Sequence, residues 1–96
     1  MEKYFKLRLP ARYRVDVRGA DNAWQRGEIR NMNSKEALLC VSQKGSLPEG
    51  THIGVLADWP FQRDGVNLQL QLTGFIIRSH FNRAAVKIHS MEIKPA

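Results

Sequence analysis

The chain has 96 residues, of which 43% are hydrophobic and 25% are charged, and its 15 Lys and Arg against 9 Asp and Glu give a net charge of +6 with histidine neutral. This length excludes a two-domain protein, a large α/β barrel enzyme and a repeat array, and the composition excludes a disordered tail. No segment approaches the roughly 20 apolar residues of a membrane span. Residues 1–6 also lack the apolar run of a signal peptide, so we expect a cytoplasmic protein without membrane insertion.

The positive charge is concentrated near the N terminus. Residues 1–18 hold six cations and two anions, a balance of +4 out of the total +6. A run of charges is often only a solvated face of a protein. Concentrated cations also predict an anionic partner, such as a nucleotide, a nucleic acid or a lipid surface.

Alternation of apolar and polar residues predicts β-strands along the chain. In residues 11–18, Tyr13, Val15 and Val17 fall on one face and the arginines on the other. Residues 66–72 alternate more strictly, the pattern continues through Gly74 and Ile76, and Gly74 predicts a bulge or bend. The full set of predicted strands is 11–18, 24–31, 37–41, 51–58, 66–78 and 84–90.

Segments rich in Gly, Pro, Asn and Asp separate these strands and predict turns at 19–22, 45–50 and 59–65. Residues 79–83 read as a hairpin tip between the last two strands. Six short strands at this spacing, without a sustained helical period, predict an all-β fold: a small, closed or nearly closed antiparallel barrel. We find no linker or repeat, so residues 1–96 are expected to form one domain.

The sequence holds no motif that predicts catalysis. There is no nucleophile elbow, no glycine loop for phosphate and no zincin helix, so we expect neither an enzyme nor a bound metal or cofactor. His80 and His89 flank the last predicted hairpin without a third ligand. Cys40, the only cysteine, lies in an apolar run and is expected to be buried and unreactive.

The segment Arg8-Leu9-Pro10-Ala11-Arg12 is the most informative part of the N terminus. Pro10 favours extended geometry at Leu9, which excludes a helix interior. Two arginines four residues apart on an extended chain stand roughly 13 Å apart, at about 3.3 Å per residue. Their planar guanidiniums are suited to bidentate contacts with phosphates and with the guanine O6/N7 edge.

Further segments follow these arginines in a recognisable order. They are 27–39, 47–51, Asp58-Trp59-Pro60, the stretch 72–79 with Gly74-Phe75-Ile76-Ile77-Arg78-Ser79, and 84–88. This order and spacing resemble the PilZ domain, a bacterial module that binds cyclic di-GMP, over nearly the whole chain. The resemblance implies a six-stranded antiparallel barrel over residues 13–90, in some members with a short C-terminal helix. Residues 1–12 would then be a flexible arm that wraps over the ligand.

The second family motif, Asp/Asn-x-Ser-x-x-Gly, is altered in this chain. In the preferred register Asn31 fills its first position, Asn33 replaces Ser and Glu36 replaces Gly. A shift by one residue keeps Ser34 but loses the acidic or amide residue. The resemblance therefore implies Arg8, Arg12, Asn31, Asn33 and Ser34 as ligand-binding residues. Glu36 would add bulk and negative charge near the phosphates.

The resemblance implies a cyclic di-GMP receptor that changes its conformation and its contacts with a downstream protein partner when ligand binds. Two alternatives remain. A degenerate PilZ domain would have lost the ligand and would act through protein contacts at Trp59, Phe61 and Phe81. A small basic barrel would bind single-stranded nucleic acid by stacking bases on scattered aromatic residues, namely Trp24, Phe75 and Phe81.

Overall fold

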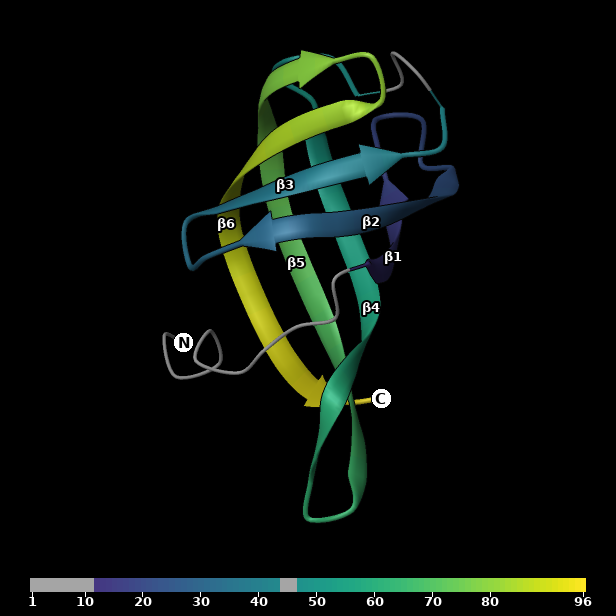
Figure 1. Ribbon diagram of the computed structural model, residues 1–96, viewed down its shortest axis with the longest axis vertical. Coiled ribbons are helices and arrows are strands. Elements are labelled where there is room, and N and C mark those ends of the chain that lie inside the picture. The colour runs from purple at the N-terminus through teal and green to yellow at the C-terminus, as the bar shows by residue number, and fades with distance from the viewer. Residues whose placement is uncertain (1–11, 44–46) are drawn as a thin grey trace.

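Six antiparallel strands form a closed barrel in the computed structural model, which describes residues 12–43 and 47–96 (Figure 1). The predicted all-β, six-stranded barrel is therefore confirmed. Around the barrel the strands follow the order β1-β2-β3-β6-β5-β4. Their bounds are β1 Tyr13–Arg18, β2 Trp24–Met32, β3 Glu36–Val41, β4 His52–Arg63, β5 Val66–His80 and β6 Arg83–Pro95.

The alternation read from the sequence is what places side chains inside and outside the barrel. In β1, Tyr13, Val15 and Val17 are buried, while Arg14, Asp16 and Arg18 are exposed. The largest fully buried side chains come from all strands except β2: Leu39, Leu70, Ile76, Val17, Val55 and Val86. No polar or charged residue among those described is buried, so the interior is an apolar core and the outer face carries the polar chemistry.

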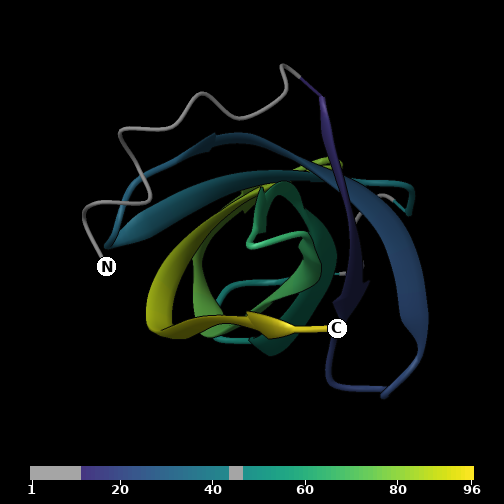
Figure 2. The ribbon, with the colours of Figure 1, turned by 90° about the horizontal axis from the view of Figure 1, so that it is seen from below.

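The strands differ in length, and this gives the barrel an uneven shape. In Figure 1, β2 and β3 cross in front of β5 and β6, and the β4–β5 hairpin extends beyond the other strands. Figure 2 looks along the long axis, with β4, β5 and β6 curled round the interior and β2 and β3 passing over one side. The outer face of β1, β2 and β3 is thus a broad surface across one part of the barrel.

The barrel closes through a short pairing of β1 with β4. Among the described residues, only Asp16–Arg18 pair with Leu56–Gly54, and β1 diverges from β4 towards its own start. The Tyr13 hydroxyl spans this divergence and donates a hydrogen bond of 2.7 Å to the Asp58 carbonyl oxygen. We call the opening between residues 13–15 and 57–59 the seam.

The turn between β4 and β5 is shorter than the sequence predicts. Strand β4 continues to Arg63, and the two-residue turn consists of Asp64 and Gly65, both with positive φ. The prediction of a turn over 59–65 was therefore wrong in extent. Trp59 is only 5% exposed, and its ring packs edge-on against Tyr13 and Phe61, because burial of the indole outweighs the local turn signal of Pro60.

The C-terminal residues are also extended. Residues 83–95 form β6, which continues five residues beyond the predicted end of the barrel at residue 90. The short C-terminal helix that some PilZ domains carry is not present, and no helix occurs in residues 12–43 and 47–96. None of the described residues therefore forms a helix capable of crossing a membrane.

Candidate functional site

Charged side chains of β1 and β2 face each other on the outside of the barrel. Arg14 pairs in register with Glu28, and Asp16 pairs with Arg26. The Arg26 Nε lies 3.8 Å from Asp16 Oδ1, and the Arg30 Nε lies 3.2 Å from Glu28 Oε2. The exposed fractions of these side chains range from 26% for Glu28 to 80% for Arg26, so screening by water leaves the two ion pairs contributing little stability, roughly 0–1 kcal/mol each. The two guanidiniums therefore lie on the outer surface beside carboxylates that hold them only weakly.

The register extends this pattern across five strands. Starting from Arg14, cross-strand neighbours form one outer row: Arg14, Glu28, Cys40, Arg83 and His80. A parallel row, nearer the start of β1, is formed by Asn31, Leu38, Ala85 and Arg78. We call the charged residues of this surface the basic face: Arg12, Arg14, Arg26, Arg30, Arg78 and Arg83, with the carboxylates Asp16 and Glu28. Six cations against two anions make it strongly positive.

A groove of about 320 Å³ runs over this face, lined among others by Arg14, Arg26, Arg30 and Cys40. Asn82, at the tip between β5 and β6, borders the groove at its far end. The Asn82 carbonyl accepts a 2.8 Å hydrogen bond from the Val41 amide, which fixes this tip against the end of β3. The groove therefore has arginines from two strands on one side and a fixed hairpin tip on the other.

The sequence-predicted site residues have different positions relative to this groove. Arg8 lies outside the described residues. Arg12 is exposed and directly precedes Tyr13, which pairs with Ile29, so the chain reaches β1 beside the end of β2. The register of β2 with β3 shifts between Ile29 and Asn31, and both Arg30 and Asn31 are exposed as a result. Arg12 and Asn31 are thus brought to one end of the basic face.

Asn33 and Ser34 lie in the three-residue turn 33–35 between β2 and β3. The Asn33 Oδ1 accepts hydrogen bonds from the backbone amides of Lys35 at 2.8 Å and Glu36 at 2.9 Å, and its own amide donates to the Glu36 carbonyl at 2.9 Å. The carbonyl end of this side chain is therefore occupied by the turn. Ser34 is partly exposed next to it.

Glu36 occupies an ordinary strand position. It pairs in register with Lys87 of β6, and it is not among the residues with positive φ. Nothing in its backbone conformation requires glycine. The predicted negative charge has a lysine as its cross-strand partner on β6.

Cys40 corrects one expectation. It is partly exposed on the outer face rather than buried, because β3 buries only Ala37, Leu39 and Val41 and turns Leu38 and Cys40 outward. An apolar run that is half-buried looks the same in sequence as one buried on both faces. Among the described residues no three His, Cys, Asp or Glu side chains form a cluster that could hold a metal ion.

The aromatic residues predicted to contact a protein partner or to stack on nucleic-acid bases differ in their burial. Trp59 is buried and Phe61 is partly buried against the core, so neither is a surface anchor. Phe81 is 68% exposed at the β5–β6 tip, with a φ of 55°. Trp24 is 45% exposed with the Arg18 guanidinium 5.2 Å from its ring centre, and Phe75 is partly exposed beside His52.

The arginines of β1, β2, β5 and β6 were not predicted as a site. A signal was present, because Arg14-x-Asp16-x-Arg18 and Arg26-x-Glu28-x-Arg30 put charges on the outward positions of two predicted strands. The sequence does not reveal, however, which strands pair with each other. Only the pairing of β3 with β6 brings Arg83 beside Cys40. Comparison of the chain with family models, curated proteins and solved structures gave no match.

Proposed function

We propose that this chain is a receptor domain of the PilZ type that binds cyclic di-GMP on its basic face. The observation that supports this most strongly is the groove lined by Arg14 of β1 and by Arg26 and Arg30 of β2, on an outer face to which β5 and β6 add Arg78 and Arg83. A cyclic dinucleotide carries two phosphates and two planar bases. Guanidiniums bind phosphates through paired hydrogen bonds and stack on bases, so this surface suits both parts of the ligand.

Three of these arginines are available to an anion. Arg14, Arg78 and Arg83 have no carboxylate within ion-pair distance among the residues that the structure describes. Arg26 and Arg30 are paired, but through exposed contacts that cost little to exchange for a phosphate. Arg12, the described member of the family's N-terminal arginine pair, adds a further exposed guanidinium where the chain enters β1.

The altered second motif is compatible with this proposal. Asn31 is exposed and keeps both a donor and an acceptor for a base edge. Asn33 stands where the family pattern has Ser, and its side-chain oxygen accepts hydrogen bonds from two amides of the turn. Glu36 faces Lys87 in register, which reduces its repulsion of phosphates. We therefore expect weakened but measurable affinity.

Calorimetric titration of the full chain with cyclic di-GMP tests the proposal. We expect a dissociation constant near 1 μM, which corresponds to about −8 kcal/mol. Arg14→Ala and Arg30→Ala should each weaken binding about tenfold or more, because each removes a charge-assisted contact. Arg18→Ala is the matched control, since Arg18 lies on the same strand as Arg14 but outside the groove, over Trp24. It should bind like the wild type.

The position of the ligand can be checked with Cys40, because it lines the groove and is the only cysteine. Saturating cyclic di-GMP should slow its alkylation by a maleimide several-fold. Absence of heat at millimolar ligand would overturn the proposal and favour the degenerate domain that acts through protein contacts. Binding of an unrelated oligonucleotide instead, with a steep loss of affinity as salt increases, would favour the nucleic-acid alternative.

A further inference from the structure

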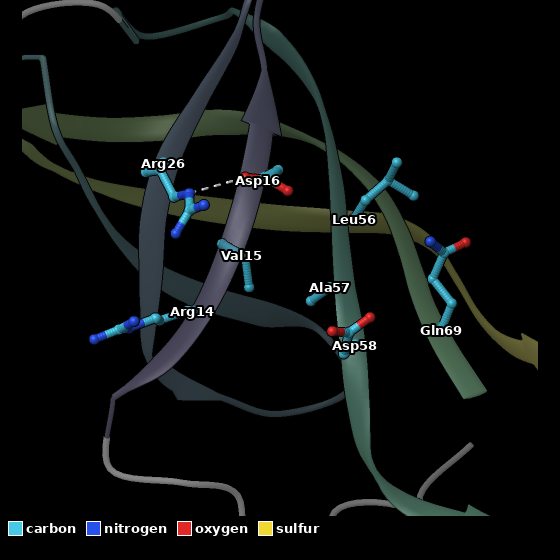
Figure 3. A pocket seen from close by; sticks show the side chains of 8 residues that line it. All are labelled: Arg14, Val15, Asp16, Arg26, Leu56, Ala57, Asp58 and Gln69. Carbon is cyan, nitrogen blue, oxygen red and sulfur yellow. Dashed lines mark ion pairs between the residues drawn. The ribbon is translucent and has the colours of Figure 1, made fainter. Parts of the chain in front are cut away.

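A second cavity, of about 350 Å³, opens at the seam between β1 and β4 (Figure 3). Arg14, Asp16 and Arg26 lie on one side of it, on β1 and β2, and Asp58 and Gln69 lie on the other side, on β4 and β5. Arg14 and Arg26 also line the groove of the basic face. The two hollows therefore share these two arginines, which lie between them on β1 and β2.

Asp58 and Gln69 offer an acceptor beside a donor. They are direct cross-strand partners on adjacent strands, which places their Cβ atoms about 4.5–5.5 Å apart. The Asp58 carboxylate is exposed and makes no hydrogen bond or ion pair with another residue in the described part of the chain. The Gln69 Oε1 accepts a 3.0 Å hydrogen bond from Gln71 Nε2, which leaves the Gln69 NH₂ group as a donor.

We propose that Asp58 and Gln69 recognise the Watson–Crick edge of a guanine base and make this domain select guanine over adenine. This inference rests on the proposed cyclic dinucleotide function. Guanine presents two adjacent donors, N1–H and N2–H₂, next to one acceptor, O6. A carboxylate can accept only, and it can take both donors at once, while the Gln69 amide donates to O6. Adenine presents an acceptor at N1, which a carboxylate repels.

The arrangement of strands makes this contact reachable from the arginines. Neighbouring strands lie about 4.8 Å apart, so the seam separates the phosphate-binding arginines from Asp58 by roughly one to two strand spacings. Asp58 itself would be unfavourable for a dianionic ligand on charge alone. If charge alone decided affinity, neutralising Asp58 would tighten binding of the ligand. Recognition of guanine by Asp58 predicts the opposite, a loss of affinity.

Titration of the full chain with cyclic di-GMP and with cyclic di-AMP tests this. The wild type should prefer cyclic di-GMP by about tenfold or more. Asp58→Asn should weaken cyclic di-GMP about tenfold, because the new NH₂ group faces the guanine N1–H, and it should narrow or reverse the preference, since Asn pairs well with adenine. Gln69→Glu should also weaken cyclic di-GMP, because it replaces the donor to O6 with an acceptor.

Asp21→Asn is the matched control, since Asp21 is an exposed carboxylate in the β1–β2 turn outside this cavity. Its affinities should stay within about twofold of the wild type. If the wild type binds no cyclic di-GMP, the proposed function fails and this inference falls with it. If the wild type binds but Asp58→Asn binds equally well or more tightly, or if cyclic di-AMP binds the wild type as well, only the guanine subsite is overturned.

Discussion

Tyr13 shows how one side chain bridges two strands of the barrel where their backbones do not pair. Its ring is buried in the core against Trp59, and its hydroxyl reaches across the seam to the Asp58 carbonyl oxygen. Because β1 and β4 do not pair at this level, that carbonyl has no amide partner from β1 among the described residues. Burial of the ring, with the negative charge of Asp58 as a second cause, raises the pKa of the Tyr13 phenol well above its ordinary value of 10.0.

Tyr13→Phe should therefore lower the free energy of unfolding by about 1–2 kcal/mol, since it leaves a partly buried carbonyl unsatisfied. Thr73→Val is the control, because the Thr73–Ser90 contact is exposed and water can replace it. Urea unfolding of both variants measures the difference. A loss no larger for Tyr13→Phe than for Thr73→Val would contradict this role of the hydroxyl.

The same substitution changes how stability depends on pH. The folded phenol has the raised pKa, so its contribution to stability is complete below the unfolded value near 10 and is lost as the pH rises towards the folded value. The wild type should lose stability above about pH 10 more steeply than Tyr13→Phe in the same urea series.

At the scale of elements, β5 illustrates why a strand needs a glycine at one position. The register of β5 with β6 shifts between Thr73 and Gly74, which confirms the bulge predicted from the sequence. A Cβ at Gly74 would collide with the Lys87 carbonyl oxygen and lie 2.9 Å from Val86 Cγ1. The close approach of β6 at this point is therefore possible only without a side chain.

Gly74→Ala should destabilise the fold by about 1–3 kcal/mol, the usual cost of overpacking a core. Gly54→Ala is the matched control, because the nearest atom to its added Cβ is the end of the Arg18 side chain at 3.9 Å. Thermal unfolding followed by circular dichroism should show a clear decrease in Tm for the first variant and little change for the second. Equal Tm values would mean that β6 can move away at no cost.

Other elements show where local sequence patterns were insufficient. The strict alternation in residues 13–18 predicted a strand and its buried face correctly, because a half-buried strand has a period of two. In residues 66–72 it predicted the strand, but only Leu70 and Leu72 are buried, and Val66 near the β4–β5 turn is 45% exposed. Residues 59–63 contain Pro60 and were predicted to turn, yet they continue β4 because Trp59 packs into the core. Cys40 was placed on the wrong face, since side-chain hydrophobicity alone does not say which face of β3 is inside.

For the whole molecule, the weakest part of the barrel is the closure between β1 and β4. These strands pair over three residues in the described chain, whereas β5 and β6 pair over twelve. Local opening follows the least-supported contacts, so this closure should open before the rest of the sheet. The proposed ligand would bind next to it, over the arginines and Asp58 that flank the seam.

Hydrogen exchange followed by NMR should therefore show faster exchange for the paired amides of residues 16–18 and 54–56 than for those of residues 70–76. Cyclic di-GMP should slow exchange of the first group, because the ligand links both sides of the seam, and should have little effect on the second. Uniform protection of both groups without ligand would show that the barrel opens only as one unit.

The sequence by itself determined the net positive charge, the six strands, most of their buried faces and the bulge at Gly74, because period-two patterns and turn residues act over a few neighbouring positions. Only the tertiary structure decided which strands are neighbours. Cross-strand register is a contact between residues far apart in the chain, so the row from Arg14 to His80 and the pair Asp58–Gln69 have no local signature. The arginines of β1, β2, β5 and β6 share one outer face only because the barrel closes with β3 beside β6 and β1 beside β4.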